Sequence, residues 1–198
     1  MLYLFLHKLV RLTCRIIYRV HVIGLENVPK NGPVLICPNH ISNFDPPVLA
    51  STLDRQIHFM AKAELFKVPL FGKLITQLGS YPVERGNGDN NAIQQSIRIL
   101  AQNKVVTIFP EGTRSKTGVL KEGKTGAAQI ALASGTPIIP TAIISNYRLF
   151  GPVWIIFCKP IQVENYGTAR ELNEEVARLV TNDVMEAIRL SIQNAKVT

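Results

Sequence analysis

Two residues five positions apart, His40 and Asp45, could together activate a hydroxyl group. The apolar run at residues 34–37 precedes them and has the length of a buried strand. Pro46 and Pro47 follow and indicate the first turn of a helix, which the Asp45 carboxylate is suited to cap. A turn between this strand and this helix can fold the carboxylate onto one ring nitrogen of His40. The other nitrogen would then be free to accept a proton.

The same two residues also have a purely structural interpretation. A histidine in a surface loop and an aspartate that only caps a helix would produce the same spacing. One histidine and one aspartate are a weak signal by themselves, so the spacing alone leaves both interpretations open.

A second motif favours the chemical interpretation. Residues 109–115, with the sequence Phe-Pro-Glu-Gly-Thr-Arg-Ser, follow another apolar run that begins at Val105. Together with the Asn-His-x4-Asp pattern, this motif resembles the glycerolipid acyltransferase family, and the closest match is to the 1-acyl-sn-glycerol-3-phosphate acyltransferases. The resemblance runs from residue 22 to residue 144. Its other blocks occur in the family's order, at residues 24–29, 62–66, 69–72, 79–85 and 138–140.

The resemblance implies a reaction and a set of site residues. The reaction is the transfer of a fatty acyl group from a thioester of coenzyme A or acyl carrier protein to the 2-hydroxyl of lysophosphatidic acid, which forms phosphatidic acid. His40 would be the general base and Asp45 would orient it, with no metal or other cofactor. The residues implied in phosphate binding are Arg85, Glu111, Gly112, Thr113 and Arg114. Pro82 departs from the family pattern, which more often has an apolar residue there. Family members that acylate glycerol 3-phosphate or another lysolipid are the near alternative.

The composition indicates a globular protein with a polyanionic partner. Lys and Arg number 22 against 14 Asp and Glu, which leaves a formal net charge of +8. No repeat of basic and aromatic residues supports a nucleic-acid surface. Cys14, Cys37 and Cys158 are widely separated, which is typical of reduced, structural thiols in a cytoplasmic protein. The histidines lack the spacing of metal ligands.

One pattern points to a different class of protein. Residues 118–125 formally fit the P-loop, G-x4-G-K-T, which binds nucleotide phosphates. A P-loop begins directly after a strand, however, and the preceding strand-like run ends at Phe109. No later apolar run ends in the aspartate that would help to hold Mg²⁺. An NTPase is therefore disfavoured.

Residues 1–20 predict an amphipathic helix ahead of an acyltransferase domain at residues 21–198. Its cations fall on one side of the helix, at Lys8, Arg11, Arg15 and Arg19. A cation at the middle of a bilayer costs about 2.5–3.5 kcal/mol, so a helix lying flat in an anionic membrane surface is favoured over a spanning one. We therefore expect peripheral or monotopic attachment at the cytoplasmic face of the cell membrane. The alternatives are a helix packed on the domain's own core, and a membrane-docked protein without enzymatic activity.

The rest of the chain alternates between strand-like and helix-like segments, with no linker or repeat. This alternation predicts a single α/β domain with a mixed, largely parallel central sheet flanked by helices. The predicted strands are residues 20–25, 34–37, 57–61, 81–83, 105–109, 137–144 and 153–158. The predicted helices after the one at Pro46 are residues 70–78, 90–103, 126–134 and 169–193.

Overall fold

The strands of the chain form one seven-stranded sheet in the computed structural model, which describes residues 2–84, 90–167 and 173–195. The strand order is β1-β7-β6-β2-β5-β3-β4, and all neighbours run parallel except β6 and β7. The strands are β1 (Arg19–Ile23), β2 (Val34–Pro38), β3 (Ile57–Lys62), β4 (Tyr81–Val83), β5 (Val105–Thr107), β6 (Ile138–Ser145) and β7 (Pro152–Phe157). The predicted α/β fold with a mixed, largely parallel sheet is confirmed.

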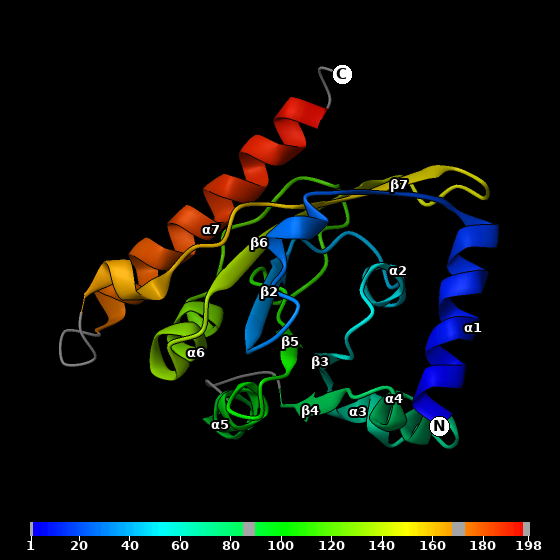
Figure 1. Ribbon diagram of the computed structural model, residues 1–198, viewed down its shortest axis with the longest axis horizontal. Coiled ribbons are helices and arrows are strands. Elements are labelled where there is room, and N and C mark those ends of the chain that lie inside the picture. The colour runs from blue at the N-terminus through cyan, green and yellow to red at the C-terminus, as the bar shows by residue number, and fades with distance from the viewer. Residues whose placement is uncertain (1, 85–89, 168–172, 196–198) are drawn as a thin grey trace.

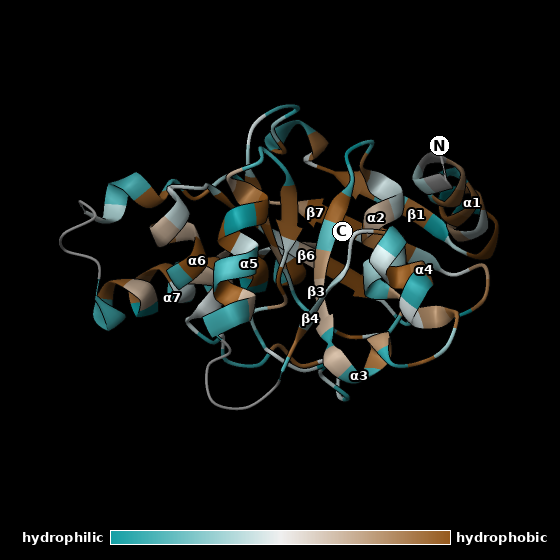
Figure 2. Ribbon diagram, turned by 90° about the horizontal axis from the view of Figure 1, so that it is seen from below, coloured by the Kyte–Doolittle hydropathy of each residue, from teal (hydrophilic) through white to brown (hydrophobic). Residues whose placement is uncertain are grey.

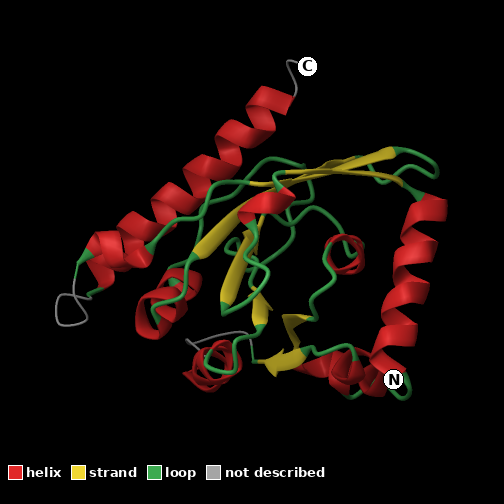
Figure 3. Ribbon diagram, viewed as in Figure 1, coloured by secondary structure: helices red, strands yellow, loops and turns green. Residues whose placement is uncertain are grey.

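Helices cover both faces of this sheet (Figures 1 and 3). On one face lie α5 (Asn90–Leu100), α6 (Gly126–Ser134) and α7 (Glu174–Ala195), and on the other lie α1 (Leu2–Ile17) and α2 (Asp45–Thr52). Leu35 and Cys37 of β2 pack in the core under α5–α7, whereas Val34 and Ile36 pack in the core under α1 and α2. Every residue of β2 is therefore buried, which explains its continuous apolar run. In Figure 2 the central strands are mostly brown, the colour of hydrophobic residues.

Shorter helices complete the described secondary structure. They are α3 (Ala63–Phe66), α4 (Phe71–Gln77) and the 3-10 helices Leu25–Asn27 and Val163–Tyr166. The sequence did not predict α3, which is a single turn. The last helix begins at Glu174, and its predicted start at residue 169 falls outside the described residues.

The N-terminal helix is shorter than the sequence predicted, and one of its faces packs on the domain. It ends at Ile17, and Arg19 already belongs to β1, so the predicted helix boundary at residue 20 is wrong. Cys14 and Tyr18 are buried in the core with α2, and His7 Nε2 lies 3.1 Å from the carbonyl oxygen of Ala50. No helix of the described ranges has both the length and the apolar character needed to cross a bilayer.

Both sequence motifs lie in loops at the same edge of the sheet. β2 and β5 are adjacent parallel strands, with Ile36 beside Thr107. The chain after β2 enters the loop with His40, and the chain after β5 enters the loop with Glu111. The carboxyl ends of neighbouring parallel strands meet at one edge, where open α/β sheets bind their ligands.

Candidate active site

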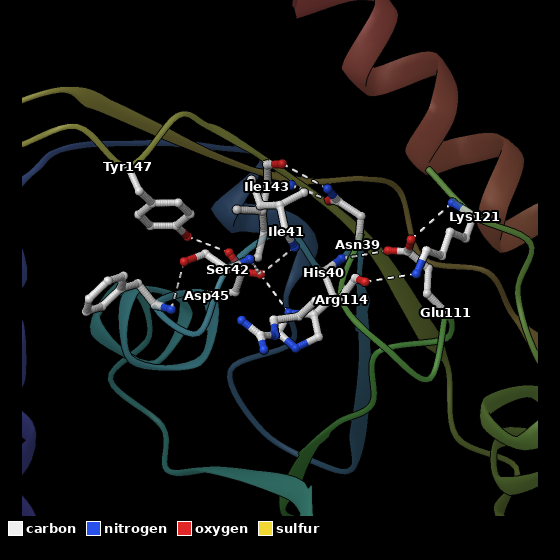
Figure 4. A network of polar contacts seen from close by, with 11 residues as sticks. Asn39, His40, Ile41, Ser42, Asp45, Glu111, Arg114, Lys121, Ile143 and Tyr147 are labelled. Carbon is white, nitrogen blue, oxygen red and sulfur yellow. Dashed lines mark hydrogen bonds and ion pairs between the residues drawn. The ribbon is translucent and has the colours of Figure 1, made fainter. Parts of the chain in front are cut away.

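The loop between β2 and α2 is folded around the Asp45 carboxylate, which is fully buried. Its Oδ2 atom accepts hydrogen bonds from the backbone amides of Ile41 at 2.7 Å and Ser42 at 2.8 Å. His40 Nδ1 lies 2.7 Å from the same oxygen, so the contact predicted between His40 and Asp45 is present (Figure 4). The Tyr147 hydroxyl donates to Oδ1 at 2.6 Å. A buried carboxylate needs such donors, because burial removes its hydration.

The predicted role of Asp45 as a helix cap is wrong. Phe44 is the N-cap residue of α2, no side chain caps this helix, and Asp45 is the first helical residue. The carboxylate instead turns back onto the amides of the preceding loop. Pro46 and Pro47 do occupy the first turn of the helix, as the sequence predicted.

The His40 ring has one engaged nitrogen and one available nitrogen. The carboxylate of Asp45 can only accept, so Nδ1 carries the proton of the neutral ring. Nε2 then has a free lone pair, and it has no hydrogen-bond partner among the residues that the structure describes. The ring stacks on Phe109 with centroids 3.9 Å apart, and 13% of the side chain is exposed. This arrangement suits a general base whose reactive nitrogen faces a substrate.

Glu111 ties the His40 loop to the neighbouring loop after β5. Its Oε1 atom accepts the backbone N–H of His40 at 2.7 Å, and Oε2 accepts the backbone N–H of Lys121 at 3.0 Å. The Ser115 amide donates to the His40 carbonyl at 2.8 Å. Glu111 is only 4% exposed, and both of its oxygens are engaged. These contacts hold the backbone of the His40 loop, and the phosphate contact that the resemblance implied for Glu111 stays a prediction.

Asn39, directly before His40, was not singled out from the sequence. Its buried side chain donates to the Ile143 carbonyl at 3.0 Å and accepts the Ile143 amide at 2.6 Å. These bonds join the end of β2 to β6. The signal for Asn39 was its place in the Asn-His-x4-Asp pattern.

The other residues implied in phosphate binding lie in the loop after β5. Thr113 and Arg114 are exposed, and the Arg114 side chain extends toward the His40 ring in Figure 4. Gly112 has a φ of +69°, and a Cβ added there would lie 3.1 Å from Lys124 Cε. The Lys121 ammonium donates to Thr113 Oγ1 at 3.1 Å and to the Arg114 carbonyl at 2.8 Å. Lys121 and Lys124 therefore extend this basic loop. Arg85 lies outside the described residues.

Two other features of the sequence are the cysteine in β2 and the stretch that resembles a P-loop. Cys37 is fully buried, and burial raises the pKa of its thiol, in keeping with the structural thiol that the sequence predicted. The P-loop-like stretch at residues 118–125 does not follow a strand directly, since β5 ends at Thr107.

Comparison with known proteins places these residues in a family. The family model described as Acyltransferase matches residues 19–144. A 1-acyl-sn-glycerol-3-phosphate acyltransferase of Bacillus subtilis is 32% identical over 154 residues, covering 75% of this chain and 76% of that protein. A chloroplastic protein of the same name from Brassica napus is 30% identical over 186 residues, covering 87% of this chain and 52% of that protein. The chain thus spans about half the length of several curated relatives, including 54% of the Borreliella burgdorferi protein.

A solved structure shares the fold. The crystal structure of the 1-acyl-sn-glycerophosphate acyltransferase from Thermotoga maritima superposes with a TM-score of 0.79 and 23% sequence identity. The similarity covers 99% of this chain and 82% of that one. It supports the arrangement of sheet and helices described above.

The bonds made by Glu111 predict a loss of stability when one of its oxygens is replaced. In Glu111→Gln the side-chain amide group must face one of the two backbone N–H donors, which leaves that buried donor unpaired. We expect the free energy of unfolding to fall by about 1–3 kcal/mol, measured by urea denaturation. The control is Glu122→Gln, an exposed carboxylate in the same loop, which should change it by about 0.5 kcal/mol or less. Equal stability of the two variants would contradict the role assigned to Glu111.

Proposed function

The chain belongs to the acyltransferase family, and from this membership we propose that it transfers a fatty acyl group from an acyl thioester to the 2-hydroxyl of 1-acyl-glycerol 3-phosphate. The product would be phosphatidic acid, the precursor of membrane phospholipids. Relatives that cover most of this chain bear the name of this activity. The observation that carries the proposal is the His40 ring, held at Nδ1 by a buried carboxylate and open at Nε2.

With this geometry the reaction is a direct transfer of the acyl group from the thioester to the acceptor hydroxyl. His40 Nε2 takes the proton of the acceptor hydroxyl while the oxygen attacks the thioester carbonyl. A C–O bond forms, the C–S bond breaks, and the thiolate leaves with the proton that His40 held. Asp45 stabilises the imidazolium between these steps. A general base contributes about 10²–10⁴-fold. A thioester is already activated, so no covalent acyl-enzyme is needed.

The basic loop after β5 is suited to the phosphate of the acceptor. The exposed guanidinium of Arg114 can bind a phosphate through two parallel N–H groups. Thr113 can donate its hydroxyl, and Lys121 and Lys124 add two positive charges to the same loop. Gly112 allows the turn that brings these groups together. Arg85 remains a candidate from the resemblance alone. The acyl donor would be a thioester of coenzyme A or of acyl carrier protein, and neither needs a further cofactor.

The outer face of α1 supports attachment to a membrane. One face of this helix is buried against the domain, yet the other exposes a row of large apolar side chains. They are Phe5 at 65%, Leu9 at 49%, Leu12 at 57% and Ile16 at 60% exposure. Lys8 and Arg15 are exposed beside this row, at the position of lipid headgroups for a helix lying flat. Packing of α1 on the core explains why its inner face is buried. It does not explain why its outer face exposes large apolar side chains.

Two of the four predicted membrane cations have partners within the chain. Arg11 forms an ion pair with Asp54 at 2.5 Å, and Arg19 donates from β1 to the Phe150 carbonyl at 3.0 Å. Lys8 and Arg15 are therefore the stronger candidates for contact with anionic lipid. The proposed location is the cytoplasmic face of the cell membrane, with peripheral or monotopic attachment, because the thioester donors are cytoplasmic.

The test of the proposed reaction is release of free thiol from an acyl thioester in the presence of lysophosphatidic acid. His40→Ala should lower turnover by about 10²–10⁴-fold, since the variant lacks the general base. The control His21→Ala removes a ring of β1 that stacks on Trp154 of β7, and it should retain the wild-type rate. A His40→Ala variant as active as wild type would refute the mechanism. Thiol release with glycerol 3-phosphate but not with lysophosphatidic acid would favour the near alternative.

The proposed membrane contact is tested by co-sedimentation with anionic vesicles over a salt series. Each cation near such a surface is worth about 1 kcal/mol, so Lys8→Gln with Arg15→Gln should weaken binding by about tenfold to thirtyfold at low salt. The control pair Arg178→Gln with Arg189→Gln removes the same charge from α7, which lies across the sheet from α1 (Figure 1). Equal weakening by both pairs would show a non-specific effect of net charge and would contradict the assignment to α1.

A further inference from the structure

A tyrosine far from both motifs contacts the catalytic carboxylate. Tyr147 lies 102 positions after Asp45 in the chain, and its hydroxyl donates to Asp45 Oδ1 at 2.6 Å. The other three donors of this carboxylate, His40 Nδ1 and the amides of Ile41 and Ser42, all converge on Oδ2. Among the described residues, Tyr147 is thus the only donor to Oδ1. Figure 4 shows the phenol entering from the side opposite to Glu111.

The fold holds the Tyr147 ring in place at a cost in backbone strain. Tyr147 follows β6 with a φ of +51°, a left-handed conformation that is unfavourable for a residue other than glycine. Its amide donates to Ser145 Oγ at 2.9 Å. The ring packs edge-on against Tyr18, with centroids 5.4 Å apart, and at a tilt of 37° against Phe44, with centroids 6.0 Å apart. These contacts leave the hydroxyl directed at Asp45.

Tyr147 stays a donor over the working pH range. Burial, and then the neighbouring Asp45 carboxylate, raise the pKa of the Tyr147 phenol well above its usual value. Cys14 of α1 and Tyr18, which directly follows this helix, act in the same direction. A phenol that keeps its proton donates a hydrogen bond to the carboxylate that it contacts and so stabilises the negatively charged form of that carboxylate.

We propose that Tyr147 is a positioning residue for the reaction proposed above. Its hydroxyl fixes the rotation of the Asp45 carboxylate, so that Oδ2 remains aligned with His40 Nδ1. Tyr147 acts through Asp45 and does not need to contact either substrate.

Tyr147→Phe tests this role, because it removes the hydroxyl and keeps the ring that packs on Tyr18 and Phe44. A hydrogen bond to a charged group carries enough free energy to lower kcat by about tenfold to a hundredfold. KM for lysophosphatidic acid should change by less than about threefold, since no substrate contact is lost.

The matched control is Tyr166→Phe. Tyr166 also donates its hydroxyl to an aspartate, Asp183, at 2.5 Å, but this pair joins the 3-10 helix at Val163–Tyr166 to α7. The Tyr166→Phe variant should leave kcat and KM unchanged. The folded fraction of Tyr147→Phe is measured by urea denaturation. The proposal would be overturned if this fraction fell by as much as kcat does, because loss of folded protein would then explain the loss of kcat.

A double-mutant cycle tests whether Tyr147 acts through Asp45. If it does, Tyr147→Phe should cause no further loss in an Asp45→Asn background, whereas an independent role would give additive losses and overturn the proposal. The proposal rests on the proposed function, but one readout is independent of turnover. The ¹H NMR signal of the His40 Nδ1 proton, which reports its bond to Asp45 Oδ2, should shift in Tyr147→Phe, and an unchanged signal would overturn the proposal. Absence of thiol release by the wild-type protein would instead refute the proposed function.

Discussion

The site depends on how a fully buried carboxylate obtains its hydrogen bonds. Asp45 has no exposed surface, and a buried carboxylate without partners would cost several kcal/mol. The loop after β2 meets this demand by turning its own amides, at Ile41 and Ser42, toward Oδ2. The same turn brings the His40 ring onto that oxygen. The conformation of the loop and the orientation of the base therefore have one physical cause.

The parallel sheet supplies the second part of the site. Because β2 and β5 are neighbours, the loop with His40 and the loop with Glu111 leave the same edge. Glu111 is another buried carboxylate that accepts backbone amides, one from each loop. The second loop is thereby joined to the His40 loop, and its exposed Arg114 side chain extends toward the His40 ring (Figure 4). In the proposed reaction, proton transfer and phosphate binding would then act on one acceptor molecule, whose hydroxyl and phosphate are only a few bonds apart.

The sequence predicted the parts of this structure that local patterns encode. Apolar runs and turn residues located the strands, and two ordered motifs identified His40 with Asp45. The rest depends on contacts between distant segments. Whether Asp45 caps α2 or turns back to the loop is decided by which amides the fold leaves unpaired. Arg11 and Asp54 are 43 positions apart, and Tyr147 reaches Asp45 from a loop after β6. No periodicity or spacing in the sequence encodes such pairs.

The central claim is that Asp45 holds His40 with a protonated Nδ1 and an open Nε2. The most direct measurement is a long-range ¹H–¹⁵N NMR spectrum of the His40 ring in ¹⁵N-labelled protein, at a pH where the ring is neutral. We expect the chemical shifts of a protonated Nδ1 and an unprotonated Nε2. A proton on Nε2, with Nδ1 unprotonated, would contradict this account, because His40 could not then accept a proton from a substrate hydroxyl at Nε2.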